Sequence, residues 1–395
     1  MSEEVNNRLW NGNYTKVLAA NFCMYFAFYL ITPLLPIYLS ERFLSTKDTI
    51  GAVLSGYILL AFLIRPFSGY LADSFSRKRV LVFFAVTCFI LFGGYLAASS
   101  LLMFTIVRTL HGGPFGGFTV ANSTMAIDAL PSSRRTEGIG LYGISNNIGT
   151  ALAPTVGILI YKYIGSFNVI FWLAFLVSFI GFYLTTRINP PQKEIKEEKF
   201  KLSLDRFFLK RGWIIAVNIL FFGYCYGVLS SYLAIYGKEA LGITGGTGAF
   251  FMLLSCGLIL SRLYGRKSLK KGKLLSNALW GIIISTVGYT IFIVWSSPIS
   301  YYGSALLIGL GNGHMWPAFQ NMIINLAENN RRATANSTIL TSWDLGMGIG
   351  ILLGGIFSEK MGYTAAFYSS VFMHFAGLVT YFIATKGDYK RNALR

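Results

Sequence analysis

The chain has 395 residues, of which 54% are hydrophobic and only 13% are charged, and its formal net charge is +18. A soluble chain carries roughly twice this fraction of charged residues, so the composition excludes an ordinary soluble domain and indicates a membrane protein. The basic residues lie in short runs between long apolar segments, which excludes a nucleic-acid-binding surface. The cysteines fall inside apolar segments without metal-ligand spacing, so we expect neither a metal nor a cofactor.

Twelve segments have the roughly 20 apolar residues that a membrane-spanning helix needs. In chain order they lie near residues 15–39, 50–72, 80–98, 102–126, 139–162, 167–187, 212–237, 247–265, 274–295, 300–325, 334–358 and 363–385. The longest polar interruption, 188–211, separates six spans from six. The sequence therefore predicts an all-α membrane protein with an N-terminal six-helix bundle (1–187), a cytoplasmic linker (188–211) and a C-terminal six-helix bundle (212–395).

The distribution of Lys and Arg supports an even number of spans. If the N-terminus is cytoplasmic, most of the basic residues between spans fall on the cytoplasmic side, where such residues are retained. The external loops then carry only Arg42, Lys47, Lys162, Lys238 and Lys360. One missed span in mid-chain would destroy this asymmetry. We therefore expect a multi-pass protein of the plasma membrane, the inner membrane of a bacterium, with both termini in the cytoplasm.

The second half of the sequence repeats the first at a constant shift. Arg65 falls on Arg262, 197 residues later. At the same shift, Arg134-Arg135 fall on Arg331-Arg332, Gly112 and Gly116 on Gly309 and Gly313, and Gly149 and Gly157 on Gly346 and Gly354. Two six-span halves related by an axis along the membrane normal are predicted, with a substrate site near the midplane between them.

A glycine-led basic loop follows the second span, with the sequence Gly69-Tyr-Leu-Ala-Asp73-Ser-Phe-Ser-Arg77-Lys-Arg79. It is similar to the GxLaDrxGrk signature of the major facilitator superfamily, with Ser76 where glycine is usual, and the chain resembles that family over essentially its whole length. The resemblance implies that Asp73 pairs across the loop as part of a conformational latch. A purely topogenic basic loop is the alternative.

A second signature closes the fourth span, with the sequence Asp128-Ala-Leu-Pro-Ser-Ser-Arg134-Arg135-Thr-Glu137-Gly138. The resemblance implies that Asp128 lies near Arg77 and Glu137 near the basic loops, in pairs that break as the cytoplasmic side opens. The alternative is a loop that is always solvated.

Two further motifs lie inside spans. Arg108-Thr-Leu-His111-Gly112 resembles the family's RxxqGxgaa motif, with His111 in the usual Gln position. A guanidinium inside a membrane needs water or a partner, so Arg108 either faces the cavity in coupling or anion contact, or forms a structural pair. Gly149, Pro154 and Gly157 in the fifth span resemble a motif of the drug-antiporter branch. Their spacing favours close helix packing, and we count them among the gating residues.

Polar and aromatic residues in spans one, four, seven and ten are expected to line the pathway, because these spans line it in the family. The candidates are Asn21, Tyr25, Tyr29, Thr32, Asn122, Tyr224, Tyr226, Tyr232, His314, Trp316, Gln320 and Asn321. Each tyrosine could instead face lipid. For proton coupling, the candidates are Asp344, which lies well inside a span, together with Arg108 and His111. A static pair of Asp344 with Arg65 or with other groups of the second span is the competing interpretation.

These features predict a secondary active transporter rather than an enzyme. No GxxxxGK[ST] motif, HExxH motif or nucleophile elbow occurs in the sequence, so the energy must come from a proton or solute gradient. The leading hypothesis is a monomeric exporter that exchanges protons for a small organic solute, a drug or a metabolite. Proton-coupled uptake of a sugar or organic anion is the alternative, and a membrane-embedded sensor or enzyme is a more distant one.

Overall fold

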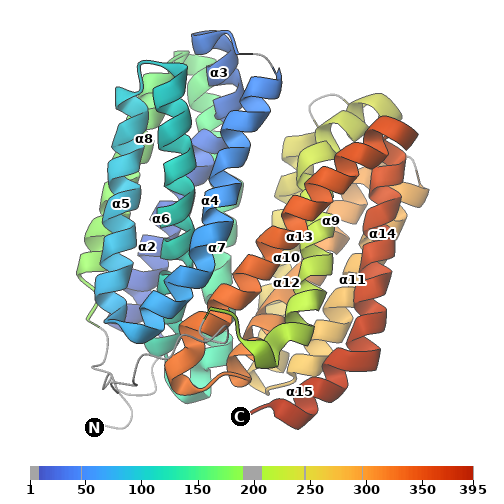
Figure 1. Cartoon of the computed structure of the whole chain (residues 1–395). Coiled ribbons are helices and arrows are strands. Elements are labelled where there is room, and N and C mark those ends of the chain that lie inside the picture. Colours follow the sequence, from blue (N-terminus) through green and yellow to red (C-terminus); the bar gives the residue numbers. More distant parts are fainter. Residues whose placement is uncertain (1–8, 46, 190–206, 244–245, 296, 395) are drawn as a thin grey trace. The chain divides into compact units, whose positions relative to one another are not determined.

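The computed structural model describes residues 9–45, 47–189, 207–243, 246–295 and 297–394, and within them all regular structure is helical (Figure 1). The long helices of the first half are α2 (Gly12–Ile31), α4 (Lys47–Ser74), α5 (Arg77–Ala97), α6 (Leu101–Asp128), α7 (Arg135–Ile164) and α8 (Phe167–Thr186). Those of the second half are α9 (Trp213–Leu241), α10 (Thr247–Lys270), α11 (Leu274–Val294), α12 (Pro298–Asn325), α13 (Arg332–Met361) and α14 (Tyr363–Thr380). They confirm the predicted all-α fold, with six long helices in each half.

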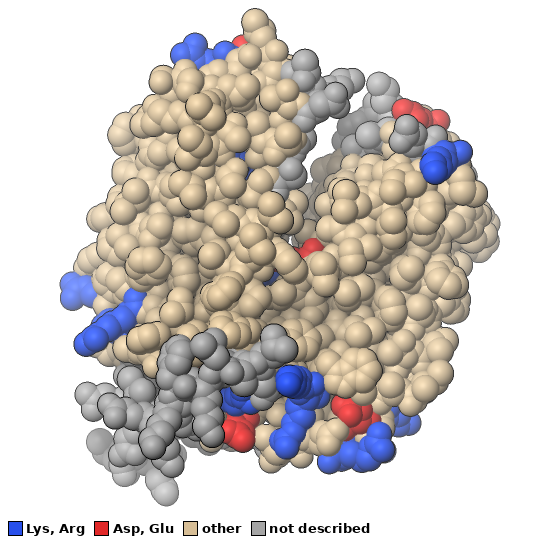
Figure 2. Space-filling model, viewed as in Figure 1, with Lys and Arg blue, Asp and Glu red and all other residues tan. Residues whose placement is uncertain are grey.

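Nine helices of the described residues are long and apolar enough to cross a membrane. The helices α6, α7 and α12 do not meet this criterion, although they are 28, 30 and 28 residues long. The buried face of α6 carries Arg108, His111 and Asn122, which lowers its hydropathy. Figure 2 shows that charged side chains gather toward the helix ends, while most of the surface along the sides of the helices is uncharged.

The first span is not one continuous helix, in contrast to the prediction for residues 15–39. It consists of α2, a 3₁₀ turn (η1, Thr32–Leu34) and α3 (Leu35–Phe43). Pro33 and Pro36 follow each other closely here, and proline supplies no N–H for the helical ladder. The last span is also altered, since α14 continues through a π-helical segment (η6, Tyr381–Thr385) into α15 (Lys386–Asn392).

Glycines allow the helices to approach each other closely, and they do so in the same way in both halves. A methyl group added at Gly112 of α6 would collide with the backbone oxygen of Tyr57 on α4. One added at Gly309 of α12 would collide with the backbone oxygen of Leu254 on α10. Because Tyr57 and Leu254 are themselves separated by the repeat shift, the internal repeat seen in the sequence reappears as a repeated helix contact.

The chain forms two compact units. Unit 1 comprises Met1–Gly138, Ser145–Phe208 and Arg331–Ser337, and unit 2 comprises Ile139–Ile144, Leu209–Asn330 and Thr338–Arg395. Short segments at the start of α13 and in α7 thus belong to the unit of the other half. Most of the predicted linker 188–211 lies outside the described residues, and its boundaries stay a prediction. The short 3₁₀ segments η2 (Ser132–Arg134), η4 (Lys210–Gly212) and η5 (Asn329–Arg331) precede α7, α9 and α13.

Candidate functional site

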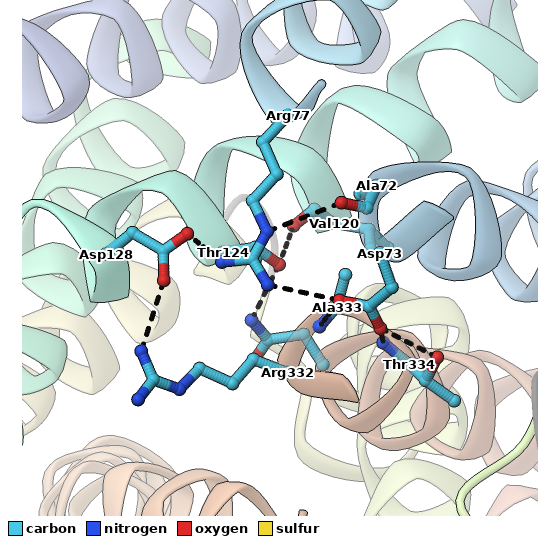
Figure 3. A network of polar contacts seen from close by, with 10 residues as sticks. Ala72, Asp73, Arg77, Val120, Thr124, Asp128, Arg332, Ala333 and Thr334 are labelled. Carbon is cyan, nitrogen blue, oxygen red and sulfur yellow. Dashed lines mark hydrogen bonds and ion pairs between the residues drawn. The ribbon is translucent and has the colours of Figure 1, made fainter. Parts of the chain in front are cut away.

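A charge network formed by Asp73, Arg77, Asp128 and Arg332 lies in unit 1, at the first turn of α13 (Figure 3). Asp73, near the end of α4, accepts hydrogen bonds from the backbone N–H of Ala333 at 3.1 Å and of Thr334 at 2.8 Å. The Thr334 hydroxyl donates a third bond at 2.9 Å. The first N–H groups of a helix have no partner within it, and the N-terminal end of the helix dipole favours a negative charge. Asp73 therefore caps α13.

Arg77 and Asp128 extend the network so that opposite charges alternate. Arg77 pairs with Asp73 at 3.2 Å and also with Asp128, and Asp128 in turn pairs with Arg332 at 3.2 Å. The side chains are at most 15% exposed, so each charge depends on its neighbours for compensation. The structure thus brings together three residues that the signatures singled out, and it adds Arg332.

Close packing supports the network on one side. A methyl group at Gly69 would lie 2.6 Å from Cβ of Ser337 and 3.0 Å from the backbone oxygen of Ala333. The Ser337 hydroxyl donates to the backbone oxygen of Arg65 at 2.5 Å. Gly69 is therefore required for α4 to approach the first two turns of α13.

The second signature also forms an ion pair within unit 1. Arg134 donates from Nε and Nη2 to Oε2 of Glu137, at 3.3 and 3.1 Å, and Glu137 is only 3% exposed. Arg135 is the first residue of α7. Arg134 and Glu137 thus form a local ion pair at the start of α7.

Arg108 and His111 are buried in unit 1, next to one another on α6. The Arg108 guanidinium lies over the rings of Tyr57 and Phe28, at 4.6 and 5.0 Å from their centroids. The Tyr95 hydroxyl lies 3.5 Å from Nη1 of Arg108 and 3.1 Å from Nδ1 of His111. Within the described residues no carboxylate pairs with Arg108. Aromatic faces and a phenol therefore hold this cation, and its charge is not neutralised.

An amide cluster joins α2, α6 and α7. Asn122 donates to Oδ1 of Asn21 at 3.2 Å, and Asn21 donates to the Ser145 hydroxyl at 2.7 Å and to Asn146. Both Asn21 and Asn122 are fully buried. Two of the predicted pathway residues are thus hydrogen-bonded to one another inside unit 1.

The other first-span candidates pack against their own unit. Tyr25 stacks with Tyr29, with 6.2 Å between ring centroids, and the Thr32 hydroxyl donates to the backbone oxygen of Phe28 at 2.7 Å.

The fifth-span candidates account for close packing of α7 on α2. A methyl group at Gly149 would lie 3.1 Å from Cβ of Tyr25, and one at Gly157 would collide with the backbone oxygen of Leu30. Pro154 lies inside α7, between these two glycines.

Aromatic residues of unit 2 form a cluster around Trp343 of α13. Its ring lies 5.5 Å from Tyr226 and 5.1 Å from Trp316. Tyr224 bonds to the Ser369 hydroxyl at 2.7 Å, and Tyr232 donates to the backbone oxygen of Ile351 at 2.6 Å. The hydroxyl groups of Tyr224 and Tyr232 are therefore engaged within their own unit.

The remaining candidates of unit 2 lie on α12 and α13. His314 lies 3.4 Å from Oδ1 of Asn277, and Asn321 donates to the backbone oxygen of Pro317 at 2.7 Å. Gln320 is 6% exposed. Asp344 is half-buried, twelve residues after the start of α13 at Arg332. It is therefore far from either end of its helix.

The fold and the charge network agree with the comparison of the chain with known families. The family model of the Major Facilitator Superfamily matches residues 17–313 and 278–395. The chain belongs to this superfamily. It is a multi-pass membrane transporter of small molecules and not an enzyme, as the sequence signatures predicted.

Curated relatives include two proteins of Staphylococcus aureus. The staphylopine export protein of strain Mu50 / ATCC 700699 is 25% identical over 338 residues, 81% of this chain and 83% of the relative. The quinolone resistance protein NorA of strain MRSA252 is 23% identical over 378 residues, 91% of this chain and 92% of the relative.

Solved structures share the fold at lower identity. The human organic anion transporter MFSD10 (TETRAN) has a TM-score of 0.80 at 13% identity, covering 93% of this chain and 98% of that protein. The transporter FucP in its outward conformation has a TM-score of 0.80 at 15% identity, covering 95% and 99%. This similarity confirms the fold.

The residues that the sequence analysis missed include Arg332 of the charge network and Trp343 of the aromatic cluster. Arg332 could have been found from the sequence, because it is the repeat mate of Arg135 and both begin a helix. Trp343 carries no such signal, since its neighbour Asp344 was singled out only for its charge. Its aromatic partners come from two other helices, and periodicity does not specify which helices pack together.

Proposed function

We propose that the chain exports a small organic solute from a bacterial cell in exchange for protons, by alternating access, as a monomer without a cofactor. The distribution of basic residues supports a cytoplasmic location for both termini. The relatives support export, because one is a staphylopine export protein and another a quinolone resistance protein. The substrate itself is left open between a drug and a metabolite.

The charge network is the observation that carries this proposal. It anchors the first turn of α13 to α4 and α6 through ion pairs and hydrogen bonds. Such polar contacts break and re-form when water enters, whereas packed apolar contacts do not offer discrete alternative partners. A transporter that works by alternating access needs breakable contacts of this kind, which hold one side closed while the other side is open.

Proton exchange is assigned to Asp344. A carboxylate in the middle of a membrane-spanning helix is costly and is retained for function, and Asp344 is half-buried in α13. Arg108 and His111 support coupling from unit 1, where a cation and a titratable ring share the Tyr95 hydroxyl. The charge of Arg108 also favours a solute with an anionic group.

Proteoliposomes that enclose a pH-sensitive dye test this proposal. We expect external addition of a quinolone or of succinate to raise the internal pH, because protons leave as the solute enters. Asp344→Asn should slow the initial rate of this pH rise more than tenfold, since the asparagine amide cannot bind and release a proton as a carboxylate does. Asp388→Asn, which alters a carboxylate of the terminal helix α15 that bonds to Asn392, should leave the rate unchanged.

Two outcomes would contradict the proposal. Acidification of the interior by succinate or a hexose would indicate proton-coupled uptake instead. Exchange of a labelled solute without any proton movement would rule out proton coupling, and an unaltered rate in Asp344→Asn would remove that residue from the mechanism.

A further inference from the structure

Unit 2 contains a buried arginine whose charge no described carboxylate compensates. Arg262 lies on α10, eight residues before the end of that helix at Lys270, and its side chain is 6% exposed. Its Nε and Nη1 atoms have no hydrogen-bond partner, and no described carboxylate pairs with it. By contrast, Arg77 and Arg332 of the charge network each have a carboxylate partner. Burying a guanidinium without a counter-charge destabilises the folded protein.

Two glycines make room for Arg262 and for a neighbouring histidine. A methyl group at Gly143, in the segment of α7 that belongs to unit 2, would lie 2.8 Å from Nη2 of Arg262. One at Gly265, one turn after Arg262 on α10, would lie 2.9 Å from Cε1 and Nδ1 of His314. The absence of a side chain at Gly143 and at Gly265 thus leaves space for the guanidinium and for the imidazole, respectively.

Hydrogen bonds fix the orientation of the His314 ring. The amide nitrogen of Asn277 donates to the Ser268 hydroxyl and to the backbone oxygen of Lys273, both at 2.8 Å. Oδ1 of Asn277 therefore faces Nδ1 of His314 as an acceptor, at 3.4 Å, and Nδ1 carries the proton. This leaves Nε2 as the ring atom open to a ligand. The chain neighbours of the two side chains are in close contact, because a methyl group at Gly313 would collide with the hydroxyl of Ser261.

The surroundings are electropositive and give access to the site. Lys267, Lys271 and Lys273, at the end of α10 and before α11, are exposed, and His314 is partly exposed. Exposed cations near a site raise the local concentration of anions. We propose that Arg262 and His314 bind an oxyanion, a carboxylate or a phosphate group, near the C-terminal end of α10. A guanidinium offers paired N–H donors that match the two oxygens of such a group.

Thermal unfolding of the full-length protein in detergent tests this site. At constant ionic strength, 10 mM succinate or phosphate should raise the Tm of the wild type by about 2–4 °C relative to chloride. Arg262→Gln should lose this rise, and its Tm without added anion should equal or exceed that of the wild type, because an unpaired buried charge has been removed. Lys162→Gln, which removes an exposed cation near the end of α7 in unit 1, should keep the rise.

His314→Phe provides a second variant if Arg262→Gln does not fold, and it should lose at least half of the rise. Repeating the measurement in nanodiscs identifies the source of the oxyanion. Stabilisation by phosphatidylglycerol over phosphatidylcholine in the wild type alone would identify a lipid phosphate. Stabilisation by succinate in both lipids would identify a soluble carboxylate.

The proposal is overturned if neither the soluble anions nor phosphatidylglycerol stabilise the wild type, or if Arg262→Gln or His314→Phe retains the full rise. A large fall in the Tm of Arg262→Gln without added anion would show that Arg262 is a structural contact of α7 instead. These results do not depend on proton exchange or on the direction of transport, so the site and the proposed function can fail separately.

Discussion

At the scale of single residues, the buried charged side chains differ in the groups that compensate their charge. The charge network satisfies four ionised side chains by alternation, while Arg108 rests on aromatic faces. Arg262 has neither arrangement in the described part of the chain. Removing the carboxylate of Asp128 would leave Arg77 and Arg332 without the negative charge that they share. Removing Arg262 would instead remove a buried charge that no described carboxylate compensates, so the two substitutions should affect stability differently.

Asp128→Asn tests the network at this scale. The substitution leaves Arg77 and Arg332 without their shared carboxylate, so we expect the free energy of unfolding to fall by about 2–4 kcal/mol. In a double-mutant cycle with Arg332→Gln, the two effects should fall short of additivity by about 1–3 kcal/mol, which apparent Tm values or denaturant titration can measure. Asp388→Asn serves as the matched carboxylate control and should change stability by less than about 0.5 kcal/mol. Strict additivity would show that Asp128 and Arg332 do not interact.

At the scale of helices, glycines determine how closely neighbours approach. The carbonyl oxygens of Tyr57 and Leu254 occupy the space of a side chain at Gly112 and Gly309. Backbone atoms of a packed helix cannot rotate away as a flexible side chain can. A methyl group at either position must therefore separate two helices along their length.

Gly112→Ala and Gly309→Ala should accordingly destabilise the protein to a similar extent, by about 2 kcal/mol or more each. The matched control is Gly303→Ala on α12, where a methyl group meets nothing within 4 Å. Alanine there should be neutral or slightly stabilising, because it favours the helix more than glycine does. Thermal stability in detergent measures all three. Equal tolerance of the three substitutions would contradict the described packing.

The sequence predicted the helices well and their irregularities less well. Hydropathy and the repeat located twelve helices, because apolar length and periodicity are local properties. The break at Thr32–Leu34 could have been expected from Pro33 and Pro36. A proline can also lie inside a continuous helix, however, as Pro114 does in α6. The π-helical segment at Tyr381–Thr385 has no comparable local signal.

The candidate site was predictable where family signatures supplied residues. Asp73, Arg77 and Asp128 were singled out in this way, and the structure brings them together. Contacts such as Asn21 with Asn122 depend on which helices pack together. Side-chain spacing along one helix cannot provide that information.

At the scale of the whole molecule, the proposed mechanism requires motion between two homologous units. The family assignment shows a transporter, and the proposed mechanism adds that its two sides open in turn. The charge network belongs to this mechanism only if its rupture accompanies opening. Spin labels on both units make this claim measurable, since distances between labels report motion without a substrate of known identity.

Pulsed electron paramagnetic resonance on two double-cysteine variants is the most direct test. One variant carries labels in place of Lys162 and Lys360, near the ends of α7 and α13. The other carries labels in place of Arg79, near the start of α5, and of Lys271, directly after α10. When the pH is changed, or when Asp128→Asn weakens the network, we expect one distance to lengthen as the other shortens. Distances that stay fixed, or that change in the same direction, would contradict alternating access.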